Sequence, residues 1–125
     1  MLWYVAIGSA AGGVSRYLLG GVMQRASAAF PWGTLVVNIA GSFLLGALMR
    51  YSLSAPSLSP ETRALLTIGF CGGFTTFSTF SYEAIRLMQD GEWPQALGYI
   101  AASVLVSLLA VWLGMMGAEW ILIKD

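Results

Sequence analysis

The residues best suited to chemistry lie between Gly72 and Ser81, a segment that reads GGFTTFSTFS. Its five hydroxyl side chains can donate and accept hydrogen bonds, and they interrupt an otherwise apolar run. Gly72 and Gly73 weaken a helix where they stand. An interruption at membrane depth survives only when it is buried in protein or lines a wet cavity. We therefore expect a helix break that frees the carbonyls of Gly72 and Thr75, which can hold a dehydrated cation. The alternative is an unbroken helix whose hydroxyls bond back to the preceding turn.

Three phenylalanines, Phe74, Phe77 and Phe80, recur at every third position of this segment and are expected near one face. The edge of an aromatic ring carries partial positive charge. Ring edges turned toward a pathway would contact an anion without holding it tightly, which suits conduction. Ordinary packing is the alternative interpretation for each ring.

Two further polar sets repeat with a spacing of four residues, so each set lies along one face of a helix. They are Thr34, Asn38 and Ser42 in one segment, and Tyr99, Ser103 and Ser107 in another. The amide of Asn38 needs partners in an apolar span, either as a helix–helix contact or as part of a pathway lining. The residues alone leave both interpretations open.

Two charged side chains fall inside apolar segments. Arg16 is costly there and is expected to be functional or paired, or to extend to the headgroups. At the mouth of a pore it would attract anions. Glu83 would either pair with Arg86 three residues later or face a vestibule.

The composition places these residues in membrane-spanning helices. Of the 125 residues, 58% are hydrophobic and 10% are charged, whereas a soluble domain has about a quarter charged residues. Four spans are expected, at about 2–24, 32–50, 61–88 and 94–122, with the third broken near its middle. The N-terminus has no basic residue before its apolar run, so the first span is expected to be retained. The fold class is therefore an all-α membrane protein with a single transmembrane domain over residues 1–125.

The charges are balanced between the two sides that four spans define. One side has Arg50, Arg63 and Lys124, and the other has Arg16, Arg25 and Arg86. This balance leaves two possibilities open, one weakly biased orientation or insertion in both orientations with pairing of the two forms. Glycines at small-xxx-small spacing also predict close helix contacts and an oligomer.

Several classes of protein are excluded or disfavoured. The formal net charge is zero, so no basic field indicates nucleic acid. There is no histidine, and Cys71 is the one cysteine, which excludes a zinc site built from these residues. The thiol has no evident base beside it, so an enzyme is the least favoured class.

The segment from Gly72 to Ser81 closely resembles the signature of the Fluc (CrcB) family of fluoride channels. Gly12-Gly13 with Arg16-Tyr17 resembles the first motif of that family, and the segment from Gly33 to Ser42 resembles the second. The polar positions of the fourth span fit as well, so the resemblance covers the whole chain.

The resemblance implies an antiparallel, dual-topology homodimer in the lipid of the inner (plasma) membrane, with two pores for passive fluoride export. It also implies roles for particular residues, which fall into three groups. The fluoride pore would comprise Phe77, Phe80, Asn38, Thr79, Ser78, Tyr99, Ser103, Ser107 and Thr34. The vestibule would contain Arg16 and Glu83. A structural sodium ion at the dimer interface would be held by the backbone carbonyls of Gly72 and Thr75.

Two other functions compete with this interpretation. A dual-topology, proton-coupled exporter of the small multidrug-resistance type has a similar length and number of spans. It needs an acid in an early span, and the first acidic residue here is Glu61. A structural subunit, in which the polar residues only join helices, is the other alternative.

Overall fold

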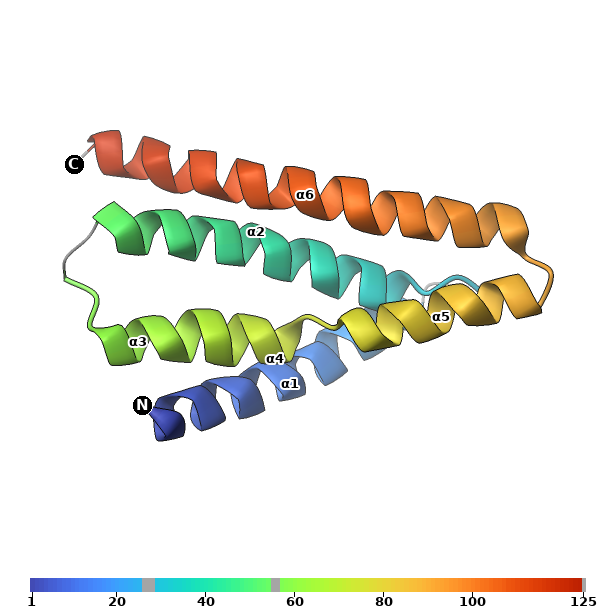
Figure 1. Ribbon diagram of the computed structural model, residues 1–125, viewed down its shortest axis with the longest axis horizontal. Helices are drawn as coiled ribbons and strands as arrows, with labels where there is room; N and C mark the ends of the chain where they lie inside the picture. The colour runs from blue at the N-terminus through green and yellow to red at the C-terminus, as the bar shows by residue number, and fades with distance from the viewer. Residues whose placement is uncertain (26–28, 55–56, 125) are drawn as a thin grey trace.

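The computed structural model describes residues 1–25, 29–54 and 57–124, and its regular elements are all helical. The elements are α1 (Leu2–Gln24), α2 (Trp32–Ser54), α3 (Pro60–Ala64), η1 (Leu65–Cys71), α4 (Gly72–Phe74), α5 (Phe77–Gln89) and α6 (Trp93–Lys124). The all-helical prediction is confirmed. Elements α3 to α5 follow one another along a single line, which we call the third pass (Figure 1).

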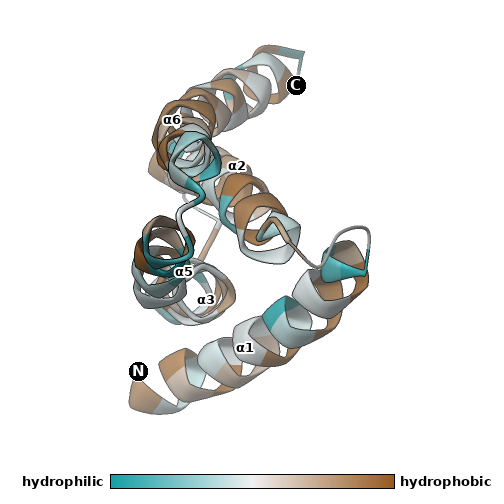
Figure 2. Cartoon of the chain, turned by 90° about the vertical axis from the view of Figure 1, so that its right-hand side faces the viewer, coloured by the Kyte–Doolittle hydropathy of each residue, from teal (hydrophilic) through white to brown (hydrophobic). Residues whose placement is uncertain are grey.

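The passes run alternately along the bundle, so that the N-terminus and the C-terminal end of α6 lie at the same end (Figure 1). Viewed along the bundle, α2 lies between α1 and α6, and the third pass covers one side of α2 (Figure 2). Three stretches of the described chain are long and apolar enough to cross a membrane, namely α2, Pro60–Gln89 and α6. Helix α1 has the same length as α2 but is less apolar, because it contains five glycines and Arg16.

Glycines bring α1 and the third pass into backbone contact. A Cβ atom on Gly8 would overlap the carbonyl oxygen of Leu65, and one on Gly12 would overlap that of Phe70. Gly69 and Gly73 on the third pass face the backbone of α1 in return. The small-residue spacing therefore does bring helices together, as expected. The contact lies within one chain, so these glycines no longer argue for an oligomer.

The third pass begins as its sequence predicts. Ser59 accepts a hydrogen bond from the backbone of Thr62 at 3.1 Å, and Pro60 occupies the first helical position. The following turns, η1, form a π-helix, which the sequence had not indicated.

The break in the third pass falls at Thr75 and Thr76, both of which have extended backbone conformations. We had expected the break between Gly72 and Thr75, and the structure places it at the C-terminal limit of that stretch. Gly72 and Gly73 are helical, and Gly73 is held against the backbone of Ser9 in α1. Packing against a neighbouring helix thus outweighs the low helix propensity of glycine.

Helices α2 and α6 pack over most of their length, again through glycines. Gly46 meets the backbone of Val111, and Gly114 meets that of Phe43. At one end of this pair Arg50 forms an ion pair with Glu119 at 2.9 Å. At the other end the turn from α5 to α6 contains Gly91, whose φ of 78° suits a residue without a Cβ atom.

Candidate functional site

The side-chain amide of Asn38 on α2 forms two hydrogen bonds with the backbone at the break in the third pass. Its Nδ2 donates to the carbonyl of Thr76 at 3.0 Å, and the backbone N–H of Thr76 donates to its Oδ1 at 2.8 Å. Thr76 is also the N-cap of α5, because its hydroxyl accepts from the backbone N–H of Thr79 at 3.2 Å. Asn38 is thus neither a simple helix–helix contact nor an unpaired lining residue, since it satisfies backbone groups that the break exposes.

Because of these bonds, two carbonyl oxygens lose the backbone N–H donors that a continuous helix would give them. In an unbroken helix the N–H of Thr76 would donate to Gly72, and the N–H of Thr79 would donate to Thr75. Both donors bond elsewhere, the first to Asn38 and the second to the side chain of Thr76. The carbonyls of Gly72 and Thr75, the two expected to hold a cation, therefore lack their helical donors. Carbonyl oxygens suit a hard cation, so this pair fits the expected sodium ligands.

A groove of about 420 Å³ runs along α2, the third pass and α6, and we call it the long groove. It brings together seven of the residues expected from the sequence: Asn38, Gly72, Thr75, Phe77, Phe80, Ser103 and Ser107. The wall of the groove is mostly apolar, and Cys71 also lines it.

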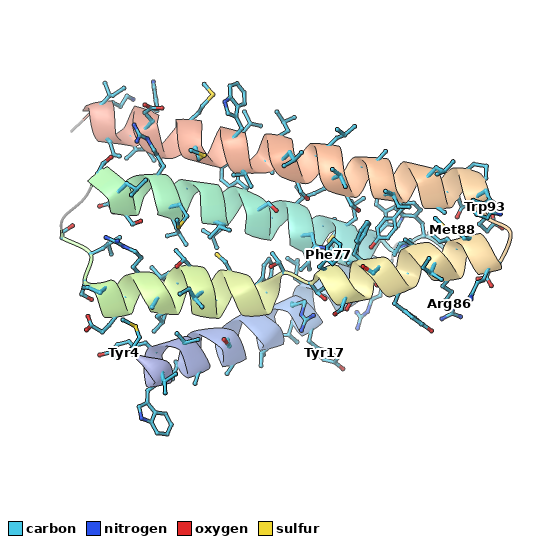
Figure 3. The ribbon with its side chains drawn as sticks, in the orientation of Figure 1. Tyr4, Tyr17, Phe77, Arg86, Met88 and Trp93 are labelled. Atoms are coloured by element: carbon cyan, nitrogen blue, oxygen red, sulfur yellow. The ribbon has the colours of Figure 1, made fainter. Side chains whose placement is uncertain are left out.

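The two rings in this groove differ in their surroundings. Phe77 is 79% exposed and lies where α5 starts, beside the break (Figure 3). Its ring centre is 5.6 Å from that of Phe80, which in turn is 5.2 Å from the ring of Tyr99. Phe74 was expected on the same face as Phe77 and Phe80, and it is not there. It precedes the break, is buried, and stacks on Phe70.

Ser103 is the most informative side chain of the long groove. It is only 8% exposed, and its hydroxyl has no hydrogen-bond partner in the part of the chain that the structure describes. A buried hydroxyl without a partner costs about 1–3 kcal/mol, so such a group needs an explanation. Ser103 lines the long groove with Phe77, Phe80 and Ser107, so its hydroxyl is an available donor at the groove wall.

A second groove of about 410 Å³ lies between α1, α2 and α5, and we call it the side groove. It contains Arg16, Thr34, Thr79 and Glu83. Thr34 donates to the carboxylate of Glu83 at 2.6 Å, and the fully buried Tyr99 donates to its other oxygen at 3.4 Å. Glu83 and Arg86 form no ion pair in the described part of the chain, and Glu83 lines the side groove.

Two expected pore residues, Tyr99 and Ser78, line neither the long groove nor the side groove. Tyr99 sits behind Glu83 and Phe80, and Ser78 is exposed at the start of α5 with its hydroxyl 3.4 Å from that of Thr76. Sequence reasoning did not single out Thr76, which lines both grooves and contacts Asn38. Its place directly before a helix start was the available signal, because Thr is a preferred N-cap residue.

The fold and the grooves define a small helical membrane protein that collects hydroxyl, amide and aromatic side chains around a broken pass. The family described as "CrcB-like protein, Camphor Resistance (CrcB)" matches residues 3–115. The chain belongs to this family.

Curated relatives support this membership over nearly the whole chain. The "Fluoride-specific ion channel FluC" of Geobacter sulfurreducens is 52% identical over 116 residues, which cover 92% of this chain and 94% of the relative. A protein of the same name from Rhizobium meliloti is 50% identical over 112 residues, covering 89% and 90%. One from Hahella chejuensis is 52% identical over 111 residues, covering 88% and 87%.

Proposed function

We propose that this protein is a fluoride-selective ion channel that lowers cytoplasmic fluoride by passive efflux. The observation that carries the proposal is the hydroxyl of Ser103, buried in the long groove with no hydrogen-bond partner among the described residues. A single O–H donor in a groove that two phenylalanine rings also line offers a small anion contact without a full positive charge. Weak contacts of this kind allow an ion to enter and to leave.

The pathway would run past Phe77, Phe80, Ser103 and Ser107, with Asn38 at its vestibule end. Thr34, Ser78, Thr79 and Tyr99 would supply the neighbouring polar groups, and Arg16 and Glu83 would line the vestibule. The names of the three relatives support fluoride as the ion. The mostly apolar wall of the long groove supports a narrow anion path rather than a wide aqueous one.

We further propose that two copies pair in opposite orientations and form two pores. Phe77 lines the long groove and is largely exposed, so one chain does not enclose a pathway. An apolar ring and an open groove are surfaces that a second copy would cover. The equal number of basic residues on the two sides permits both orientations in the membrane.

A structural sodium ion would sit between the two copies. Gly72 and Thr75, whose carbonyls lack their helical donors, are both lining residues of the long groove. A two-fold axis through this region would bring the same pair from the second copy, giving oxygen ligands from both chains. The ion would join the two broken passes and would take no part in selecting the anion.

The proton-coupled exporter is the less favoured function. Residues 1–60 contain no acidic side chain, so neither α1 nor α2 offers a carboxylate for proton exchange. Glu83 on α5 is engaged by Thr34 and Tyr99.

Fluoride release from liposomes tests the proposal. The purified protein is reconstituted in liposomes loaded with potassium fluoride, valinomycin is added, and an electrode follows external fluoride. Rapid release of fluoride, and none of chloride in parallel liposomes, is expected. Absence of release, or release that requires a proton gradient, contradicts the channel and favours the exporter.

A further inference from the structure

The side chain of Gln24, which lines the side groove but has no role of its own in the proposed pathway, bonds the start of α2. Gln24 is the last residue of α1. Its amide nitrogen, Nε2, donates to the carbonyl of Phe30 at 2.9 Å, and its amide oxygen, Oε1, accepts from the backbone N–H of Gly33 at 3.2 Å. The N–H of Gly33 belongs to the first turn of α2, where backbone donors lack a partner within the helix.

The two residues that Gln24 bonds lie beside side chains of the side groove. Thr34 follows Gly33 directly and donates to Glu83 at 2.6 Å. The ring of Phe30 meets that of Tyr99 edge-on, with centres 5.5 Å apart and planes at 84°. Thr34 and Tyr99 both bond the carboxylate of Glu83, so two separate contacts lead from the amide of Gln24 to that one group.

The backbones around this point leave little freedom. A Cβ atom on Gly33 would overlap the carbonyl oxygen of Gly20, which lies one helical turn before Gln24 on α1. The close approach fixes the distance between α1 and α2. The paired bonds from Gln24 add a constraint on the first turn of α2, at the end where the chain enters the helix.

We propose that Gln24 is a positioning residue that sets the start of α2, and thereby holds Thr34 and Phe30 against Glu83 and Tyr99. Without its amide, α2 loses a donor and an acceptor at its first turn. Thr34 then no longer keeps the carboxylate of Glu83 in the side groove, and the support of Tyr99 behind Phe80 weakens. The effect on conduction rests on the proposed channel function, whereas the effect on the Thr34–Glu83 contact does not.

The contact is tested by thermal unfolding of the purified protein in detergent. Thr34→Val and Glu83→Gln are each measured alone and together, first with Gln24 present and then in a Gln24→Met background. The midpoint shifts of the two changes are expected to be non-additive with Gln24 and close to additive with Met. Equal non-additivity in both backgrounds would overturn the proposal, whatever the protein conducts.

Single-channel recording in planar bilayers tests the consequence for conduction. Gln24→Met is expected to lower the unitary fluoride current about five-fold while the number of active channels stays the same, since each lost hydrogen bond is modest. Gln24→Asn keeps an amide on a side chain one methylene shorter, and its current should fall between. Gln89→Met, at an exposed position on α5, is the matched control and should keep the full current.

The possible failures are distinguishable. If the unmodified protein passes no fluoride, the proposed function fails and the unfolding cycle still decides the role of Gln24. If the unmodified protein conducts and Gln24→Met passes the same unitary current, the positioning role fails alone. A loss confined to the number of active channels would show that Gln24 supports only folding, and this too overturns the proposal.

Discussion

The side chain of Asn38 binds both backbone groups of Thr76, 38 residues away in sequence. One amide thus satisfies a donor and an acceptor at the break between α4 and α5. A buried backbone group without a partner is expensive, and more so in hydrocarbon, so the break depends on this side chain. The contact also fixes the start of α5 relative to α2, and α5 contains both pathway rings, Phe77 and Phe80.

Asn38→Ala is expected to lower the free energy of unfolding by about 1–3 kcal/mol and to abolish fluoride release, because both backbone groups of Thr76 lose their partner. Thermal unfolding in detergent and liposome efflux measure the two effects. Ser54→Ala, at an exposed position of α2 outside both grooves, is the control and should keep the fold and the flux. A fully active, stable Asn38→Ala protein would contradict the role given to the amide.

Phe80→Ile is expected to abolish fluoride release while the protein still elutes as an assembled oligomer, since isoleucine keeps the apolar volume and removes the polarised ring edge. Efflux and size-exclusion chromatography are the measurements. Phe43→Ile, at an exposed position on α2 outside both grooves, provides the matched control. Normal flux in Phe80→Ile would refute the contribution of the ring to the pathway.

Ser103→Ala separates conduction from stability. The hydroxyl has no partner among the described residues, so its removal is expected to leave the unfolding temperature unchanged or raised. The unitary fluoride current should nevertheless fall about ten-fold, as for the loss of one hydrogen bond to an ion. Ser52→Ala should lower the unfolding temperature and leave the unitary current unchanged. Ser52 is buried and donates to the carbonyl of Met49, far from the pathway. A current unaffected by Ser103→Ala would remove the main support for the proposed function.

Gly12→Ala is expected to destabilise the protein by about 1–3 kcal/mol, because the added methyl group meets the backbone of Phe70 in a close-packed contact. Gly13→Ala is an unusually close control. The neighbouring position has open space around its Cα, so alanine there should be neutral or slightly stabilising. Thermal unfolding of the two variants measures the difference, and equal midpoints would show that α1 and the third pass are not in backbone contact.

Removal of sodium is expected to abolish conduction if the carbonyls of Gly72 and Thr75 hold the proposed ion. Channels are purified and recorded with Na⁺ replaced by a large organic cation, and Na⁺ is then restored. Current should disappear and return, with the unitary value unchanged when it returns. Unaltered current throughout would leave the carbonyl pair without a cation role.

The sequence predicted the helices better than it predicted the break. Ser59 and Pro60 mark a helix start by local chemistry, and the structure places it there. The position of the break is decided by Asn38 and by the contact of Gly73 with α1, both remote in sequence. The contact of Thr34 with Glu83 spans 49 residues, so their spacing along the chain could not indicate it. The π-helix likewise lacks a local signal in the residues from Leu65 to Cys71.

The break at Thr75 and Thr76 has a further electrostatic consequence. Peptide dipoles add along each helical segment, so the end of α4 carries a partial negative charge and the start of α5 a partial positive charge. A continuous helix would cancel these charges at mid-length, whereas here they stand a few residues apart inside the bundle. The proposed sodium lies at the negative end and the proposed anion path at the positive end. A single interruption of the backbone thus supplies adjacent fields of opposite sign without any ionised side chain at either place.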